Sequence, residues 1–234
     1  LLETKPTAVP AGFHLAEHFR PIISKTQYQA HIGRIQDYIL AGDCYQVNYA
    51  QRFEAALEGD AWSAYRYVRT LLAGGFSGFL RTAEDRAILS LSPERFLRIH
   101  QGTVTSQPIK GTAPRHVDPE QDAALAQALL NSEKDRAENV MITDLLRNDL
   151  GQFCQTGSVN VTELCGLHSY NNVHHLVSTV EGKLAPGVSA GQMLLATSPG
   201  CSITGAPKKR AVEIIAELEP APRGAYCGSL FILG

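Results

Sequence analysis

Lys110 is the residue whose type and setting most directly suggest chemistry. It lies in the stretch PIKGTAPR at 108–115, between a short apolar run and Gly111. We expect a strand to end here and the chain to turn at Gly111, which can leave backbone on one side of the lysine and a cavity on the other. An ammonium drawn out of water favours its neutral form, and the neutral amine can attack an electrophilic carbon. The alternative is a lysine that ends a strand on a solvated turn.

Glu94 is a candidate proton donor or acceptor for the same site. It lies sixteen residues before Lys110, in SPERF at 92–96, just past the end of a predicted strand. Adjacent antiparallel strands could bring the carboxylate beside the lysine, where it could serve as a general acid or base. The alternative is a surface glutamate that pairs with Arg95 or Arg115.

Asp135 and Glu138 are candidate metal ligands on one predicted helix. They are three residues apart and therefore neighbours on its surface. Glu138 shares its face with apolar residues, namely Met141, Ile142 and Leu145. Mg²⁺ prefers oxygen ligands and takes one or two protein carboxylates, so this helix could supply part of a magnesium site. Alternatively, Asp135 favours the helix N-terminus, and Glu138 pairs with Lys134 or Arg147.

Two further features are weaker candidates. The stretch SITGAPK at 202–208 is a turn of small residues leading into a helix, where free backbone N–H groups could hold an anion. Alternatively, it is a tight loop with a proline in the first helical turn. His174 and His175 are adjacent on a predicted strand, so one faces the core or a cleft and the other faces away.

The elements that must position these residues form an α+β pattern, with groups of strands alternating with helices rather than regular βαβ units. Capping residues and apolar spacing predict helices over 25–40, 61–72, 119–130, 132–150, 189–196 and 206–218. Alternation and β-branched residues predict strands over 44–53, 76–81, 87–92, 95–100, 103–109, 158–165, 173–184 and 226–233. Residues 1–24, with three prolines and no sustained period, read as a linker or the tail of a preceding region, and 25–234 as one domain.

Composition excludes several classes of protein. The chain has 234 residues, 44% of them hydrophobic, and a net charge of -2, which predicts neither nucleic-acid binding nor attraction to a membrane. Five cysteines, odd in number and widely spaced, suggest neither a disulfide framework nor a zinc site. No apolar run approaches the roughly 18 residues that span a bilayer. We expect a soluble cytoplasmic protein.

Six blocks in order resemble the chorismate-utilising enzymes. They are GDCYQVNYAQRF, SPERF, PIKGTAPR, KDRAENVMITDLLRNDLG, VHHLVS and SITGAPKKRAVEII, and they run from residue 42 almost to the end. The ordered set is specific, although SPERF or SITGAPK alone would not be. The resemblance implies a four-layer α/β/β/α sandwich with the active site between its sheets.

The resemblance favours the branch of the family that aminates chorismate at C4, on the route to p-aminobenzoate and folate. That branch has a lysine at the position of Lys110, thought to attack C2 of chorismate, where anthranilate synthases have alanine. Gln46 stands where isochorismate and salicylate synthases hold a lysine that activates water. An anthranilate-type or hydroxylating sibling, and a non-catalytic fragment or scaffold for a glutaminase, remain alternatives.

The resemblance also implies roles for the other candidates. Glu94 would be the general acid/base at the C4 hydroxyl, and Glu138, with Asp135, would bind Mg²⁺. The residues expected to contact substrate are Gln46, Thr112, His175, Thr204 and Gly205. Ammonia would come from a separate glutaminase subunit. The family's N-terminal region and C-terminal portion are not recognisable here, so we expect the 234-residue chain alone to be inactive and prone to self-association.

Overall fold

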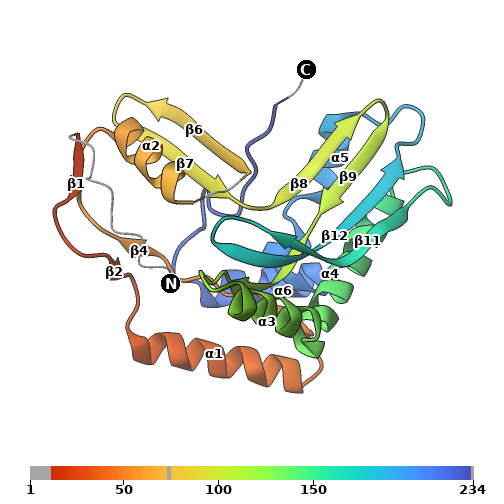
Figure 1. Cartoon of the computed structure of the whole chain (residues 1–234), viewed down its shortest axis with the longest axis horizontal. Coiled ribbons are helices and arrows are strands. Elements are labelled where there is room, and N and C mark those ends of the chain that lie inside the picture. The colour runs from red at the N-terminus through yellow and green to blue at the C-terminus, as the bar shows by residue number, and fades with distance from the viewer. Residues whose placement is uncertain (1–11, 73–74, 233–234) are drawn as a thin grey trace. The chain divides into compact units, whose positions relative to one another are not determined.

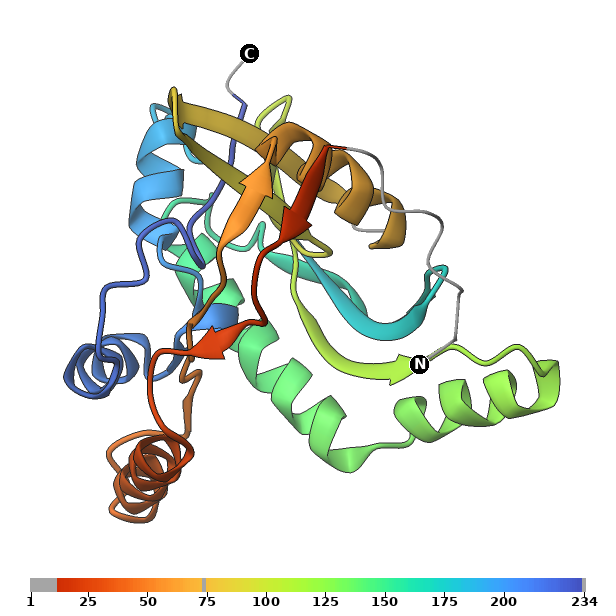
Figure 2. The same cartoon turned by 90° about the vertical axis from the view of Figure 1, so that its left-hand side faces the viewer.

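The computed structural model describes residues 12–72 and 75–232, which are coloured in Figures 1 and 2. These residues divide into two compact units. One consists of residues 68–198, and the other of residues up to 67 together with those from 199 onward. Each unit has its own core, and each is described by itself.

The first unit is built on an antiparallel five-stranded sheet. Its strands are β8 (Arg95–His100), β9 (Thr103–Gln107), β10 (Ile109–Pro114), β11 (Asn160–Ser169) and β12 (Val173–Lys183). β12 is the central strand: it pairs with β9 and β10 along one edge and with β11 along the other. Most of its residues are buried, which fits a strand covered on both faces.

β9 and β10 are one long strand interrupted at Pro108. Ser106 pairs with Val180 and Ile109 with Val177, so the two segments keep a single register along β12. Proline has no N–H to donate to a ladder, which accounts for the break. The Pro108 carbonyl still accepts from the N–H of Ser178 at 3.1 Å.

Two helices cover one face of this sheet. They are α3 (Pro119–Leu130) and α4 (Glu133–Gly151), and both contact β10, β11 and β12. The views in Figures 1 and 2 agree on this layering. α5 (Ala190–Thr197) packs on α4, and β6 (Phe76–Ala83) and β7 (Arg86–Ser92) form a separate hairpin. The core between helices and sheet is formed by buried residues that include Val104, Leu129, Ile142, Leu146, Leu176 and Val180.

The second unit is a set of short strand pairs with two helices. The helices are α1 (Lys25–Leu40) and α6 (Lys208–Leu218), which share a core of Ile35, Cys44, Ile214 and Leu218. The strand pairs are β1 (Phe13–Leu15) with β5 (Leu57–Gly59), β2 (Arg20–Pro21) with β4 (Phe53–Glu54), and β3 (Gln46–Val47) with β13 (Gly205–Ala206). A 3-10 turn, η1 (Cys201–Ile203), precedes β13. The boundary between the two units along the chain falls within α2 (Ala61–Leu71), after Tyr67.

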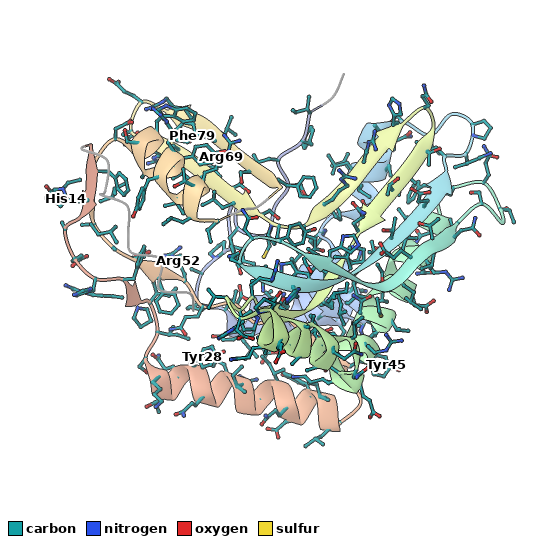
Figure 3. The ribbon with its side chains drawn as sticks, viewed as in Figure 1. His14, Tyr28, Tyr45, Arg52, Arg69 and Phe79 are labelled. Carbon is teal, nitrogen blue, oxygen red and sulfur yellow. The ribbon has the colours of Figure 1, made fainter. Side chains whose placement is uncertain are left out.

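Side-chain contacts join one pair of these short strands and also connect α1 to the segment after β3. Figure 3 labels His14 on β1, whose Nε2 lies 3.2 Å from a carboxylate oxygen of Glu58 on β5. Figure 3 also labels Tyr28 on α1, and its ring centroid lies 5.6 Å from that of Tyr49. β1 and β2 both lie within the stretch 1–24 that the sequence suggests is a linker.

The predicted helices are confirmed, most closely where a capping residue marks the start. Ser24 and Gln27 form a complete capping box before α1, and the Ser132 hydroxyl accepts from the Asp135 N–H before α4. The exception is the predicted helix 206–218. Its first residues form β13 with β3, and the helix begins at Lys208 after Pro207.

Two predicted strands are wrong, one in its extent and one altogether. Residues 44–53 form only the two-residue strand β3 and the first residue of β4. Residues 226–232 contain no strand, and Leu233, the last residue of that prediction, lies outside the described residues. A strand needs a neighbour that pairs with its backbone, and the backbone N–H groups of Tyr226 and Gly228 instead form turns to Arg223 and Ala225.

Within residues 12–72 and 75–232, no helix is both long and apolar enough to cross a membrane. The five cysteines at 44, 154, 165, 201 and 227 are all free thiols, in agreement with the absence of a disulfide framework predicted from their spacing.

Candidate functional site

Lys110 lies in a β-bulge rather than at a strand end. Ile109 pairs with Val177 and Thr112 with His175, so Lys110 and Gly111 together oppose the single residue Leu176. Gly111 has φ +93°, and a Cβ added there would lie 2.9 Å from Cβ of Asp135 on α4. The turn expected at Gly111 is therefore a bulge inside β10, pressed so closely against α4 that only glycine fits.

The Lys110 side chain forms an ion pair with Glu138. Its Nζ lies 3.2 Å from Oε1 of Glu138, and the two side chains are 14% and 27% exposed. The structure thus brings together two of the predicted site residues, which are 28 positions apart in the sequence and lie on different elements. The solvated-turn alternative for Lys110 is wrong, since most of its side chain is out of water. Glu138 pairs with Lys110, a partner that the sequence did not suggest.

Glu94 lies level with the start of β10. Arg95 opens β8 opposite Gln107 of β9, and Glu94 is the residue directly before this pair, at the end of β9 that leads to Pro108. The Glu94 N–H donates to the Ser92 hydroxyl at 3.1 Å, which holds the turn before β8. The register agrees with the idea that antiparallel strands bring Glu94 toward Lys110, and its catalytic role stays a prediction.

Thr112 and His175 form a second pair on the same sheet. The Thr112 hydroxyl lies 2.9 Å from Nδ1 of His175, and the Tyr170 ring lies edge-on to the imidazole with centroids 5.6 Å apart. Burial lowers the pKa of His175 below its ordinary value, and a hydrogen bond with the Gly111 backbone opposes that shift only in part. His175 is therefore a neutral side chain near neutral pH that can donate or accept one hydrogen bond.

His174 faces the helix layer instead. Its Nε2 lies 3.1 Å from Oδ1 of Asp122 on α3, and its Nδ1 lies 2.8 Å from the Ser169 hydroxyl. A bond from the Arg115 guanidinium, with others from the His116 N–H and His174, holds the pKa of Asp122 well below its usual range. The predicted alternation of the two histidines is confirmed, and His174 links a helix to the sheet.

The two candidate metal ligands differ in how they are engaged. Asp135 accepts a 2.5 Å bond from the Ser132 hydroxyl at the helix start, while Glu138 meets Lys110. Across the described ranges, no three His, Cys, Asp or Glu side chains gather so that they could hold a metal. Carboxylates have the chemistry that Mg²⁺ prefers, but these two could supply only part of its ligands.

The remaining candidates lie in the second unit. Gln46 and Val47 of β3 pair with Ala206 and Gly205 of β13. Gly205 has φ +138°, and a Cβ there would lie 2.1 Å from the Gln46 carbonyl oxygen, so the close strand approach requires glycine. The Thr204 hydroxyl is buried and donates to the Gly200 carbonyl at 2.9 Å. The backbone of this loop is therefore fixed, and its role in binding an anion or a substrate stays a prediction.

Sequence reasoning missed the buried polar residues behind Lys110. Asn139 and Thr143 of α4 and Ser178 of β12 are 0%, 2% and 0% exposed. The available signal was the helical stripe that Asn139 and Thr143 share with Ile142, Leu146 and Leu150. Two polar residues on an otherwise apolar stripe indicate buried hydrogen bonds.

Comparisons with known proteins identify the family of the chain. Residues 2–234 match the family model described as chorismate binding enzyme. The chain is 51% identical over 229 residues to aminodeoxychorismate synthase component 1 of Klebsiella aerogenes, which covers 98% of this chain and 51% of the relative. It is 42% identical over 212 residues to anthranilate synthase component 1 of Pseudomonas aeruginosa, covering 91% of this chain and 43% of that one.

A solved structure shares the fold. The crystal structure of anthranilate synthase component I from Streptococcus pneumoniae TIGR4 matches with a TM-score of 0.79 and 36% identity, over 88% of this chain and 44% of that chain. The α+β class predicted from the sequence is confirmed. The chain spans about half the length of the curated relatives it matches.

Proposed function

This chain belongs to the chorismate-binding enzyme family, and from that premise we propose that its protein aminates chorismate at C4 to give 4-amino-4-deoxychorismate. The observation that carries the proposal is the environment of Lys110. Its side chain extends from a bulge, is only 14% exposed and pairs with Glu138. Three relatives named aminodeoxychorismate synthase component 1 are 47% to 51% identical to the chain, and two named aminodeoxychorismate synthase are 44% and 46% identical, against 42% for an anthranilate synthase. Both the residue and the ranking support amination at C4.

The chemistry explains why a lysine and a carboxylate are both needed. Chorismate is a conjugated diene whose C4 hydroxyl is a poor leaving group, and protonation by Glu94 lets it depart as water. As the C4–O bond breaks, the Lys110 amine forms a bond to C2 and the two double bonds shift along the ring. Ammonia then adds at C4 while the C2–N bond to lysine breaks, and the double bonds return. The enolpyruvyl group is retained, and one hard displacement becomes two easier ones.

Lys110 must be a neutral amine when it attacks, so its ion pair with Glu138 has to open first. We propose that Glu138, with Asp135, contributes ligands to Mg²⁺. The ion, when bound, would neutralise a carboxylate of the substrate. The remaining ligands would come from residues beyond these two.

We propose, for each unit by itself, residues that could contact substrate. Thr112 and neutral His175 offer hydrogen bonds on the sheet, and Gln46, Thr204 and Gly205 offer a rigid backbone loop. We further propose that a glutaminase subunit supplies ammonia and that the protein acts in the cytoplasm. The name of the relatives, component 1, supports a partner subunit.

The test is a product assay with chorismate, Mg²⁺ and ammonium on the polypeptide as its source organism makes it. Aminodeoxychorismate is the expected product, and anthranilate or isochorismate would instead identify a sibling activity. Lys110→Ala should lose the covalent adduct that intact-mass analysis detects when ammonia is left out. A Lys110→Ala enzyme with normal turnover would remove the lysine from the mechanism.

A further inference from the structure

The bulge at Lys110 is held by a buried amide on the neighbouring helix. Asn139 of α4 is 0% exposed. Its Nδ2 donates to the Leu176 carbonyl of β12 at 3.0 Å and reaches the Lys110 carbonyl of β10 at 3.4 Å. A bulge interrupts the ladder between the two strands, so carbonyls there need another donor. One amide group supplies it to both sides of the bulge.

The other end of the same amide is also fixed. Oδ1 of Asn139 accepts a short hydrogen bond from the Ser178 hydroxyl and a longer one, 3.3 Å, from Thr143. The Thr143 hydroxyl in addition donates to the Asn139 carbonyl at 2.7 Å. With donors and acceptors both engaged, the amide has one orientation.

Ser178 extends the network to a second bulge on the opposite edge of β12. Leu164 and Cys165 of β11 together oppose Ser178, and Cys165 has φ +53°, unusual for a residue with a side chain. The Cys165 N–H donates to the Ser178 hydroxyl at 2.9 Å. The network therefore joins both irregular edges of the central strand to one helix.

Glu138, the ion-pair partner of Lys110, is the residue directly before Asn139. α4 thus contacts Lys110 twice, at its backbone through Asn139 and at its ammonium through Glu138. We infer that Asn139 is a positioning residue for Lys110: it sets the place and tilt of the bulge from which the lysine side chain extends. This inference rests on the proposed function for its catalytic consequence, but its geometric part stands apart from it.

The experiment measures the reactivity of Lys110 without any substrate. Protein is treated briefly with acetic anhydride, and peptide mass spectrometry gives the labelling of Lys110 relative to Lys183, an exposed lysine at the end of β12. Asn139→Leu keeps the branched shape and removes the hydrogen bonds. The Lys110 to Lys183 ratio should rise roughly fivefold as the bulge loosens and the ion pair opens more often.

Thr143→Val is the matched control. Its buried hydroxyl donates to the Asn139 carbonyl and, at 3.3 Å, to Oδ1, so its loss leaves the shorter bond from Ser178 and the Nδ2 bonds to both strands in place. We expect this variant to lose a similar amount of thermal stability while the labelling ratio stays at the wild-type value. A folded Asn139→Leu protein with a wild-type ratio would overturn the inference, as would an equal rise in both variants.

Ser178→Ala covers the case in which Asn139→Leu fails to fold. Removing this hydroxyl takes away the shorter of the two hydrogen bonds to Oδ1 of Asn139 and leaves only the longer one from Thr143, so the ratio should rise about twofold. An unchanged ratio in Ser178→Ala would then overturn the inference.

Kinetics of the natural full-length polypeptide test the catalytic consequence. In Asn139→Leu, kcat for chorismate amination should fall about tenfold to a hundredfold with KM changed less than about twofold, because misplacement affects the attack more than binding. Should the full-length enzyme make anthranilate or isochorismate in place of aminodeoxychorismate, the proposed function fails, and the labelling ratio still decides the role of Asn139.

Discussion

The bulge at Lys110 and the loop at Thr204–Gly205 both leave regular secondary structure, yet different chemistry holds them. The bulge depends on the neutral amide of Asn139 and on hydroxyl groups. The loop depends on an ion pair between Arg223 and Glu219, whose side chains are 15% and 6% exposed.

Arg223 bonds the backbone at two points beside the loop, in η1 and just after β3. Its Nη1 donates to the Ile203 carbonyl at 2.8 Å and its Nη2 to the Asn48 carbonyl at 2.6 Å, while Nε bonds Glu219 at 2.9 Å. Glu219 in turn accepts from the Ala50 N–H at 2.9 Å. The hydrogen bond to Glu219 raises the pKa of Arg223 further, so the guanidinium remains charged at any accessible pH.

The difference teaches where each region is vulnerable. A neutral network loses one or two hydrogen bonds when a member is removed, whereas a buried ion pair leaves an uncompensated charge. The two regions should therefore respond to substitution with unequal losses of stability.

The largest effect is expected at Arg223. Arg223→Met leaves the Glu219 carboxylate buried without its partner, and the free energy of unfolding should fall by about 3 to 5 kcal/mol. Urea denaturation followed by circular dichroism measures it. The double variant Arg223→Met/Glu219→Leu should recover part of the loss. Arg210→Met, which breaks a pair with Asp43 at the surface, should cost no more than about 1 kcal/mol. Equal losses of unfolding free energy in Arg223→Met and Arg210→Met would contradict the argument that the buried pair contributes more than the surface pair.

Alanine at the two special glycines gives the next effect and compares the regions directly. In Gly205→Ala the new Cβ meets the backbone oxygen of Gln46 at 2.1 Å, and in Gly111→Ala it meets side-chain atoms of α4 at 2.9 Å. Because backbone yields less easily than a side chain, we expect losses of about 3 kcal/mol at Gly205 and about 2 kcal/mol at Gly111. Thermal melts of both variants would rank them, and the reverse order would refute the argument.

A smaller effect is expected from pH at His175. Its folded-state pKa is depressed below the ordinary value of 6.5, so its contribution to stability is complete above 6.5 and is lost as pH falls through the lower folded value. Between pH 7.5 and 5, the Tm of the wild type should drop about 2 °C further than that of His175→Asn, whose side chain does not titrate. Parallel drops in the two proteins would show that His175 does not couple folding to pH here.

The smallest effect on folding is expected at the Lys110–Glu138 pair, because its carboxylate is 27% exposed and better solvated than that of Glu219, which is 6% exposed. Glu138→Gln keeps the size and removes the charge, so the free energy of unfolding should change by no more than about 1 kcal/mol. Activity should nevertheless fall, and the Mg²⁺ concentration needed for half-maximal rate should rise. A magnesium titration identical to wild type would exclude Glu138 from the metal site.

The helices were predictable because their ends are encoded locally. Ser24 with Gln27, and Ser132 with Asp135, mark helix starts within four residues of sequence. Strands depend on partners far away in the chain, which is why the strand predicted over 44–53 was too long. For the same reason, the strand predicted over 103–109 stopped short of Lys110, whereas β10 continues to Pro114.

Of the candidate site, residue types were predictable and partners were not. Lys110 and Glu138 were both selected, but nothing in the sequence says that they meet, because their contact depends on how α4 crosses β10. Asn139 has no chemical signature of its own. Its importance follows from a bulge that only the register between β10 and β12 defines.

Pro108 and the bulges beside β12 also favour one strand register as the chain folds. A one-residue slip of the long strand 103–114 would move every side chain to the opposite face, and it would align the missing N–H of Pro108 and the widened backbone at Gly111 with the wrong partners. Misaligned pairings are therefore penalised at several points along a single strand. The irregularities that position the lysine therefore also select the native strand register during folding, since only one alignment of β12 satisfies them all.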